Sequence, residues 1–568
     1  MWGKAFLALL TLLTLALACA GPSASPTSSE RTETRSEPKR LRIAIVGDPV
    51  VVFPSVDLRQ ASASAEIEDL LNAGLSVLDP DRVPQAQLAE ELPTTENGLW
   101  RVFPDGRMET TWRIREGASW HDGTPLTVSD LLFTLQVAQD RELPNFGNVA
   151  FTLMEGAEEI DSRTVVIRWS KPHVEADKMF GAIAMPMPRH LLERPYAQDK
   201  AGFLQLPYWN TEHMGTGPYR VREFVQGSHT VLQAFERYVL GRPRIDEIEV
   251  RFIRDQNTVA ANLLAGAVDA TMGRGISIEQ ALQVRDQWRE GTVAELALVS
   301  WVRIHPQFVN PNPQVVGELP FRQALLHAID RQQIVDAIQG GLVPIADMLP
   351  SPKSREGAQV GQSMVRYEYD PRRAEQLLAG MGFTRGTDGM LQDSSGRKLS
   401  VELRTTGDND ARRKSLFAVS DYWQRVGVGV EPVLVPEQLQ GDRQYRAEFP
   451  AFEVNRGGAE IAGLSQYHTR GVRLPENNFR GPGGGGTGAG GTNYPRYMNP
   501  ELDALIDRYL ATIPQAERTA LAGQVVNHIT ANVAQMGLYY DAEPAMVSNR
   551  LRNFTGYVWK PQEWDLVH

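Results

Sequence analysis

The chain has 568 residues, a length that predicts two or three cores rather than one. A hydrophobic content of 42% and a charged content of 22% are ordinary for a folded soluble protein. The formal net charge of −11 argues against a general nucleic-acid partner, which would favour a basic stripe. We therefore expect an acidic surface, on which a local basic pocket is still allowed.

The N-terminus has the pattern of an export signal. Lys4 supplies a positive start, and Ala5–Ala18 is an apolar run too short to cross a bilayer as a helix. Small residues precede Cys19, the only cysteine, as in a bacterial lipoprotein lipobox, although Ala16 stands where Leu is usual. We expect residues 1–19 to be a signal peptide and Cys19 to carry a lipid; the alternative is a stray cysteine in a cleaved signal.

Residues 20–40 are rich in Ser, Thr, Pro and charged side chains. Such a segment cannot bury enough apolar surface to fold, so it predicts a flexible tether. A lipid on Cys19 would then hold the folded part beside the membrane and outside it.

The folded region begins with Leu41–Gly47, an apolar run typical of a buried strand, and Ala65–Leu75 has the spacing of an amphipathic helix. Thr111–Asp130 predicts a strand, a tight Gly/Pro loop and a helix whose first turn is capped by Thr127 and Asp130. Farther on, Gly215–Ala270 reads as strand, turn, strand, helix and strand. This alternation predicts an α/β layered lobe.

A second lobe is expected from about Pro306. Pro320–Arg331 and the residues after it have helical spacing until Gly340 stops the pattern. Asp370 and Pro371 predict the start of another helix. Further predicted elements lie at Val401–Arg404 (strand), Arg412–Val426 (helix), Gly429–Val433 (strand), Asn499–Leu510 (helix) and Ile513–Ala534 (helix).

Several blocks, in order along the chain, carry a family resemblance. Arg115–Asp130 fits the pattern RxGxxxxDGxPxTxxD, and Leu263–Asp269 resembles an LxxGxVD signature. Phe321–Arg331 resembles an RQALxxAIDR block. From Leu41 to Tyr557 the chain resembles the extracytoplasmic solute-binding proteins of the peptide/nickel (family 5) ABC importers.

The resemblance implies an α/β protein with the type II periplasmic-binding-protein fold. Two lobes would be joined by a crossover hinge and would close on a ligand between them. The first lobe would span 41–305 with an inserted subdomain near 61–204, the second would span 306–534, and 535–568 would return to the first lobe.

The resemblance also implies site residues in Phe452–Ala462, which is similar to the family's FDVxxxGWxAD stretch. Arg456 falls where an oligopeptide-binding member has an arginine that faces the ligand, and it is suited to a carboxylate. Ala459 and Ala462 stand where the family has the cleft Trp and the Asp that holds a peptide amine. Glu460 is the candidate replacement for that carboxylate. Trp301 is either an aromatic cleft wall or a core residue, and Arg456 is either a ligand contact or a surface arginine.

Enzyme signatures are missing from the sequence. The ten histidines form no HExxH or other close metal pair, and there is no GxSxG elbow. His121 beside Asp122 predicts a loop-stabilising hydrogen bond, and Gly481–Gly491 lacks the ending of a phosphate loop. We expect no catalytic residue, no metal site and no cofactor.

The predicted function is solute capture for a membrane transporter. The resemblance implies a monomeric, lipid-anchored extracytoplasmic protein that delivers a peptide-like solute to an ABC permease. Oligosaccharides, opine-like solutes and nickel chelates are alternative cargoes. A secreted hydrolase on the same scaffold and a receptor that signals to a membrane sensor are the alternative functions.

Overall fold

The computed structural model describes residues 38–49, 52–53, 61–140, 142–143, 146, 148–273, 275–294, 297–407, 409–479 and 493–567. Cys19, most of the predicted tether and Gly481–Gly491 lie outside these residues. Their predicted roles therefore stay predictions.

A seven-stranded sheet with the order β12-β20-β11-β1-β10-β9-β8 organises the first lobe. Its central strand β1 runs parallel to β10 and β11, whereas β8 and β9 form an antiparallel hairpin beside β10. The strands are β1 (Arg40–Val46), β8 (Tyr219–Val225), β9 (His229–Ala234), β10 (Glu247–Ile253), β11 (Ala270–Thr271), β12 (Gly291–Val293) and β20 (Met546–Ser548). The associated helices are α1 (Ala61–Leu71), α5 (Gln256–Leu264) and α6 (Ile278–Gln287).

The predicted helix at Ala65–Leu75 begins and ends four residues earlier than expected. Its apolar spacing was right, because Ile67, Leu70 and Leu71 are buried in the core of this sheet. Leu75 instead comes just before the short strand β2 (Ser76–Leu78), which pairs with β3 (Pro84–Ala86).

The block Thr111–Asp130 forms the strand, loop and helix that its sequence predicts. Strand β5 belongs to a four-stranded sheet with the order β4-β5-β7-β6, and the helix after the loop is α2. Thr127 and Asp130 make the expected capping box, in which the Asp130 carboxylate accepts the Thr127 backbone N–H at 3.0 Å. The elements are β4 (Trp100–Val102), β5 (Met108–Arg113), β6 (Met154–Asp161), β7 (Thr164–Trp169), α2 (Val128–Ala138), α3 (Arg189–Gln198) and α4 (Lys200–Phe203).

A five-stranded sheet with the order β17-β16-β18-β13-β19 organises the second lobe. Its strands are β13 (Ala297–Pro306), β16 (Ser400–Thr406), β17 (Gly429–Val435), β18 (Phe452–Gly458) and β19 (Met536–Glu543). The helices of this part are α7 (Leu319–His327), α8 (Arg331–Gln339), α9 (Gly357–Gly361), α10 (Pro371–Gly380), α11 (Asp410–Arg425), α12 (Arg443–Ala447), α13 (Pro500–Ala511) and α14 (Gln515–Ala531). A small hairpin, β14 (Thr384–Arg385) with β15 (Leu391–Gln392), follows α10, and β21 (Leu551–Arg552) pairs with β22 (Asp565–Leu566) near the C-terminus.

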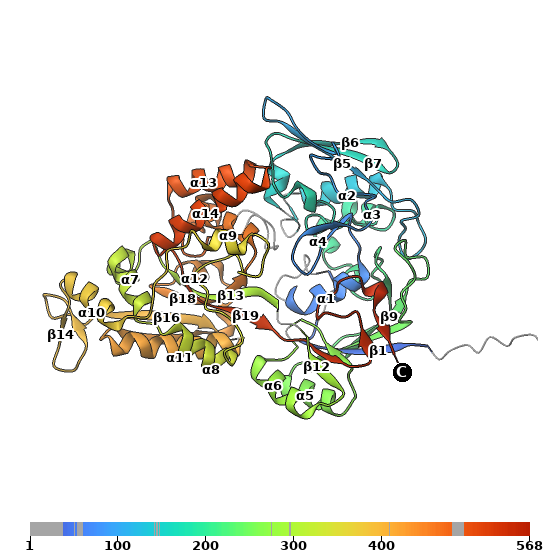
Figure 1. The fold of residues 1–568 in the computed structure, drawn as a ribbon. Helices are drawn as coiled ribbons and strands as arrows, with labels where there is room; N and C mark the ends of the chain where they lie inside the picture. Colours follow the sequence, from blue (N-terminus) through green and yellow to red (C-terminus); the bar gives the residue numbers. More distant parts are fainter. Residues whose placement is uncertain are drawn as a thin grey trace, which may run out of the picture. The chain divides into compact units, whose positions relative to one another are not determined.

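Two connections join the sheets, and Figure 1 shows both. The chain leaves the seven-stranded sheet after β12 and enters the five-stranded sheet as β13. It returns from β19 to β20, so the return occurs just after Glu543. β13 and β19 lie side by side as antiparallel neighbours. A pair of adjacent crossing strands is the arrangement expected of a hinge.

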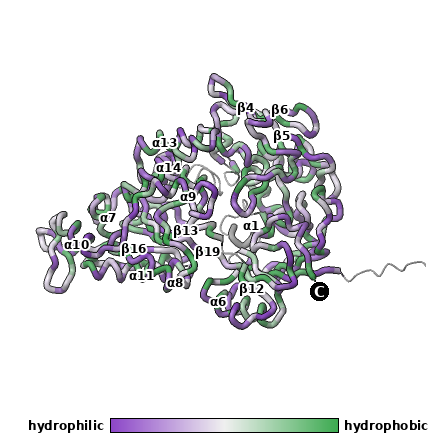
Figure 2. Tube along the Cα trace, in the orientation of Figure 1, coloured by the Kyte–Doolittle hydropathy of each residue, from purple (hydrophilic) through white to green (hydrophobic). Residues whose placement is uncertain are grey.

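Each sheet has its own hydrophobic core. One buried cluster surrounds the five-stranded sheet, and a separate cluster surrounds the seven-stranded sheet. In Figure 2 hydrophobic segments are accordingly spread through both groups of elements. Within the described part of the chain, no helix is both long enough and apolar enough to cross a membrane.

Candidate functional site

Strand β13 carries two different chemistries on its two faces. In its register with β18, Trp301 lies opposite Gly457, Val302 opposite Arg456 and Arg303 opposite Asn455. Directly paired residues project to the same side of a sheet, and successive residues project to opposite sides. Arg456 and Trp301, two of the predicted site residues, therefore lie on opposite faces of the sheet.

Arg456 is bound by another side chain of the protein. Its guanidinium donates to the Asp541 carboxylate in an ion pair whose two side chains are both buried. Gln339 donates to the same carboxylate at 2.9 Å. Arg456 is therefore no exposed surface arginine, and a ligand carboxylate would have to compete with Asp541 for it.

A small cavity borders Arg456 and Asp541. Its lining comes from the start of α6, from α8, from the first turn of α11 and from the crossing strand β19. Lys414 bridges these elements through an ion pair with Glu279 at 3.1 Å. The volume is about 100 Å³, whereas small-molecule sites span about 300–1,000 Å³. The cavity is too small for a peptide.

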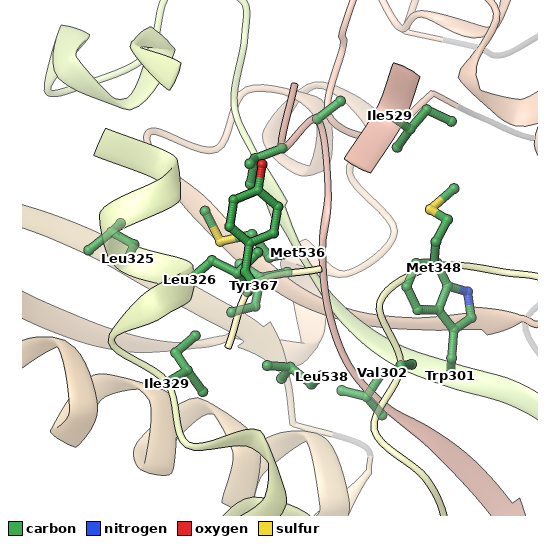
Figure 3. Packing of buried hydrophobic residues seen from close by; sticks show 14 of the residues in the cluster. Trp301, Val302, Leu325, Leu326, Ile329, Met348, Tyr367, Ile529, Met536 and Leu538 are labelled. Atoms are coloured by element: carbon green, nitrogen blue, oxygen red, sulfur yellow. The ribbon is translucent and has the colours of Figure 1, made fainter. Parts of the chain in front are cut away.

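The opposite face of β13 carries Trp301, Arg303 and His305 at alternate positions, all of them buried. Trp301 is fully buried in the core of the sheet and appears in Figure 3 among that core's side chains. The Arg303 guanidinium lies 5.0 Å from the centre of the Trp301 ring, and His305 stacks on Tyr494. Five nitrogen atoms of these three side chains have no hydrogen-bond partner among the described residues.

Two other arginines on this face are paired with a carboxylate. Arg404 donates to Glu453 at 2.9 Å, and Arg446 forms a second ion pair with the same carboxylate. Asn455 donates to it at 3.2 Å. Since Glu453 is 1% exposed, its charge is balanced entirely by protein groups.

Glu460 also has a partner. Its carboxylate lies 2.6 Å from the guanidinium of Arg82, which follows β2 in the first lobe. Glu460 precedes the short helix η8 (Ile461–Tyr467) and is partly exposed. The pair therefore links the two lobes. Ala459 is buried, and Ala462 lies within η8. Since both residues are alanine, neither position offers a polar side chain to a ligand.

His121 has the structural role that its sequence context predicts. Its Nδ1 accepts the Gly215 N–H at 3.1 Å, and its Nε2 lies 3.0 Å from the Gly217 carbonyl oxygen. Burial lowers the pKa of His121 to about 3, so the ring is neutral at physiological pH. The described residues contain no group of three or more His, Cys, Asp or Glu side chains that could hold a metal ion.

Sequence reasoning missed Arg303 and His305. In the sequence they alternate with Val302 and Ile304, a pattern that predicts a polar face turned toward water. The structure buries that face beneath η8 and the segment around Tyr494. The sequence signal for this packing was Gly457, because a glycine within a strand often marks a close approach of another group. In the structure, a Cβ at that position would lie 2.3 Å from an Arg303 nitrogen.

Solved structures identify the fold. The oligopeptide-binding protein from Thermus thermophilus, solved with a pentapeptide, superposes with a TM-score of 0.75 at 23% identity and covers 93% of this chain and 96% of that one. NikZ from Campylobacter jejuni, solved with Ni(L-His), gives a TM-score of 0.74 at 19% identity and covers 93% and 99%. The predicted type II periplasmic-binding-protein fold, with two lobes, is confirmed.

The family follows from the sequence match. Residues 84–469 match the family model for bacterial extracellular solute-binding proteins, family 5. The chain belongs to this family, whose members bind solutes outside the cytoplasm. Among curated relatives, the oligopeptide-binding protein AppA of Bacillus subtilis (strain 168) is 26% identical over 439 residues, 76% of each chain.

Proposed function

We propose that this protein is the solute-binding component of an ABC importer and that a peptide-like solute binds between its lobes. The match of residues 84–469 to the family carries the proposal, because it spans elements of both sheets. The relative from Bacillus subtilis is an oligopeptide-binding protein, and other relatives are named ABC transporter peptide-binding proteins. Peptide is therefore the first cargo to test.

Non-peptide cargo is the second candidate. Ala459 and Ala462 replace the two side chains that the family resemblance assigns to a peptide's cleft wall and amine. A protein of the same fold was solved with Ni(L-His), and another with Fe(III)-EDTA. We include nickel and iron chelates, oligosaccharides and opine-like solutes in the test.

The test combines co-purification with stability. Native mass spectrometry should detect any solute that the purified protein retains. A panel of peptides, glycans and metal chelates should then contain at least one compound that raises the melting temperature, because a ligand that binds only the folded state stabilises it by mass action. The bound compound should be recovered unchanged, since turnover would favour the hydrolase alternative. If no solute co-purifies and nothing in the panel shifts the melting temperature, the proposal fails.

Attachment to the cell envelope is a separate part of the proposal. Cys19 would carry the lipid, residues 20–40 would form the tether, and the folded part would lie on the extracytoplasmic side as a monomer. Cys19→Ala should move the protein from the membrane fraction to the soluble extracytoplasmic fraction. Retention in the membrane would contradict the lipid anchor, and light scattering of the soluble variant would test whether the protein is a monomer.

A permease gene and an ATPase gene beside this one would favour transport over signalling.

A further inference from the structure

The face of the five-stranded sheet that carries Arg303 has more buried positive than negative charge. Arg303, Arg404 and Arg446 are 4%, 1% and 8% exposed. Arg496, also buried, donates to the Ala447 carbonyl, which Gln307 contacts as well. The carboxylate that pairs with these arginines is Glu453, which binds Arg404 and Arg446.

Arg303 is the member of this group that lacks an acceptor within the described part of the chain. Its Nε and Nη1 have no hydrogen-bond partner there. The titratable side chains that act on it are Tyr467, Tyr494 and Arg456, and none of these is a carboxylate. The face of the Trp301 ring attracts the guanidinium but contributes no full negative charge.

This arrangement is costly for the protein alone. An arginine in a protein stays protonated, so burial cannot be relieved by loss of a proton. Ordered water can satisfy the hydrogen bonds of a neutral group, but it does not neutralise a buried charge. Gly457 keeps space open for the guanidinium, because a Cβ at that position would collide with it. The described residues thus hold an uncompensated cation in a fixed place.

We propose that Arg303 binds a carboxylate of the transported solute, so that the cargo is an acidic compound. The inference rests on the proposed function and names the chemistry of its ligand. A guanidinium binds a carboxylate through two parallel N–H donors. His305, two residues along the same face, has two ring nitrogens without a partner among the described residues and can donate a further hydrogen bond.

The test compares Arg303→Met with Arg404→Met. Both substitutions remove a buried guanidinium from the same face, but only Arg404 is paired with a carboxylate of the described residues. The melting temperature of each purified full-length variant is measured without added solute. Separate folded samples are then titrated with three sets of probes: a tripeptide library as free acids, the same library as C-terminal amides, and citrate beside inorganic phosphate. Arg303→Lys tests whether positive charge alone is sufficient.

Arg303→Met should raise the melting temperature of the protein without added solute, whereas Arg404→Met should lower it. The wild type should bind free acids or citrate more tightly than amides. Arg303→Met should weaken that binding by roughly 30-fold or more, as for loss of one partner of a buried charge pair. Arg303→Lys should recover part of the affinity.

Three outcomes would overturn the inference. A lower melting temperature for Arg303→Met would mean that protein contacts alone stabilise this guanidinium. Equal binding of acids and amides, unaffected by Arg303→Met, would leave solute capture intact. It would show that the solute makes no carboxylate contact with Arg303. Binding of phosphate without binding of any carboxylate would assign Arg303 to a different anion. Because the melting temperatures need no ligand, they test Arg303 even where the proposed function fails.

Discussion

Two regions of this protein bury histidine side chains in opposite ways. In the first lobe, His121 bonds to backbone groups of Gly215 and Gly217. His213 lies within hydrogen-bond distance of the Tyr208 carbonyl and of Asn72. On β13 in the second lobe, Trp301, Arg303 and His305 are equally buried, yet their side-chain nitrogens include five without a partner among the described residues.

Folding alone explains the first region and leaves the second unexplained. A buried donor or acceptor normally finds a partner, because leaving its hydrogen bond unmade costs about 1–3 kcal/mol. In the first lobe, both ring nitrogens of His121 and of His213 meet this requirement. Trp301, Arg303 and His305, at alternate positions of β13, leave it unmet among the described residues. Binding is therefore to be sought on β13 and not at His121 beside Asp122.

The largest expected effect concerns the paired end of the β13 face. Glu453→Gln should leave Arg404 and Arg446 buried without their shared carboxylate. Loss of one partner of a buried ion pair costs about 3–5 kcal/mol. Urea unfolding should show that decrease in the free energy of unfolding. Glu460→Gln is the matched control, because the Arg82–Glu460 pair is partly exposed and should contribute about 1 kcal/mol or less. Equal effects would contradict the distinction between a fully buried ion pair and a partly exposed one.

A direct test of the comparison replaces one histidine in each region by leucine. His121→Leu should leave the Gly215 N–H and the Gly217 carbonyl buried without partners, at a combined cost of about 3 kcal/mol. His305→Leu should change the free energy of unfolding by about 1 kcal/mol or less, since its ring nitrogens make no hydrogen bond to the described residues. Similar losses in both variants would show that His305 is as firmly bound by the protein as His121.

The sequence predicted much of this molecule because local signals decide local structure. The capping box at Thr127 and Asp130, the Asp370–Pro371 helix start and the apolar run of β1 all form as expected. These signals depend on residues within a few positions of one another. They required no knowledge of the distant chain.

The site was harder to predict because its properties depend on distant partners. The pairing of Arg456 with Asp541 joins residues 85 positions apart, so no local pattern shows that this arginine is engaged. In the same way, no local pattern shows that Glu460 pairs with Arg82 of the other lobe. Arg303 and His305 alternate with apolar residues along β13, and only the packing of η8 and Tyr494 decides that their face is buried.

The next prediction concerns the opposite face of the same strand. Arg456→Met should lower the free energy of unfolding by about 2 kcal/mol, because Asp541 stays buried with Gln339 as its remaining partner. The loss should be smaller than for Glu453→Gln, since the pair borders a cavity that admits water. Adding Asp541→Leu should restore most of the stability, because an apolar pair often replaces a buried ion pair without loss. If Arg456 contacts the ligand, as its position in the family motif predicts, the double variant will regain stability but not affinity.

The smallest expected effect is a pH dependence of stability to which buried histidines of both regions contribute, since burial also lowers the pKa of His305 on the β13 face well below 6.5. Burial lowers the pKa of His121 to about 3 and that of His213 to about 4, below the 6.5 of an unfolded chain. The unfolded state then binds more protons than the folded state, so stability is lost as pH falls below 6.5. Asp177 opposes this trend, because burial raises its pKa to about 6 and the folded state binds its proton first. We expect a net loss of about 1 kcal/mol between pH 7 and pH 6. His121→Leu should reduce that slope in urea unfolding at each pH. Affinity for an acidic solute should stay constant over the same interval, because the charge on the β13 face belongs to arginine. A parallel loss of affinity and stability would instead place a titrating histidine in the binding site.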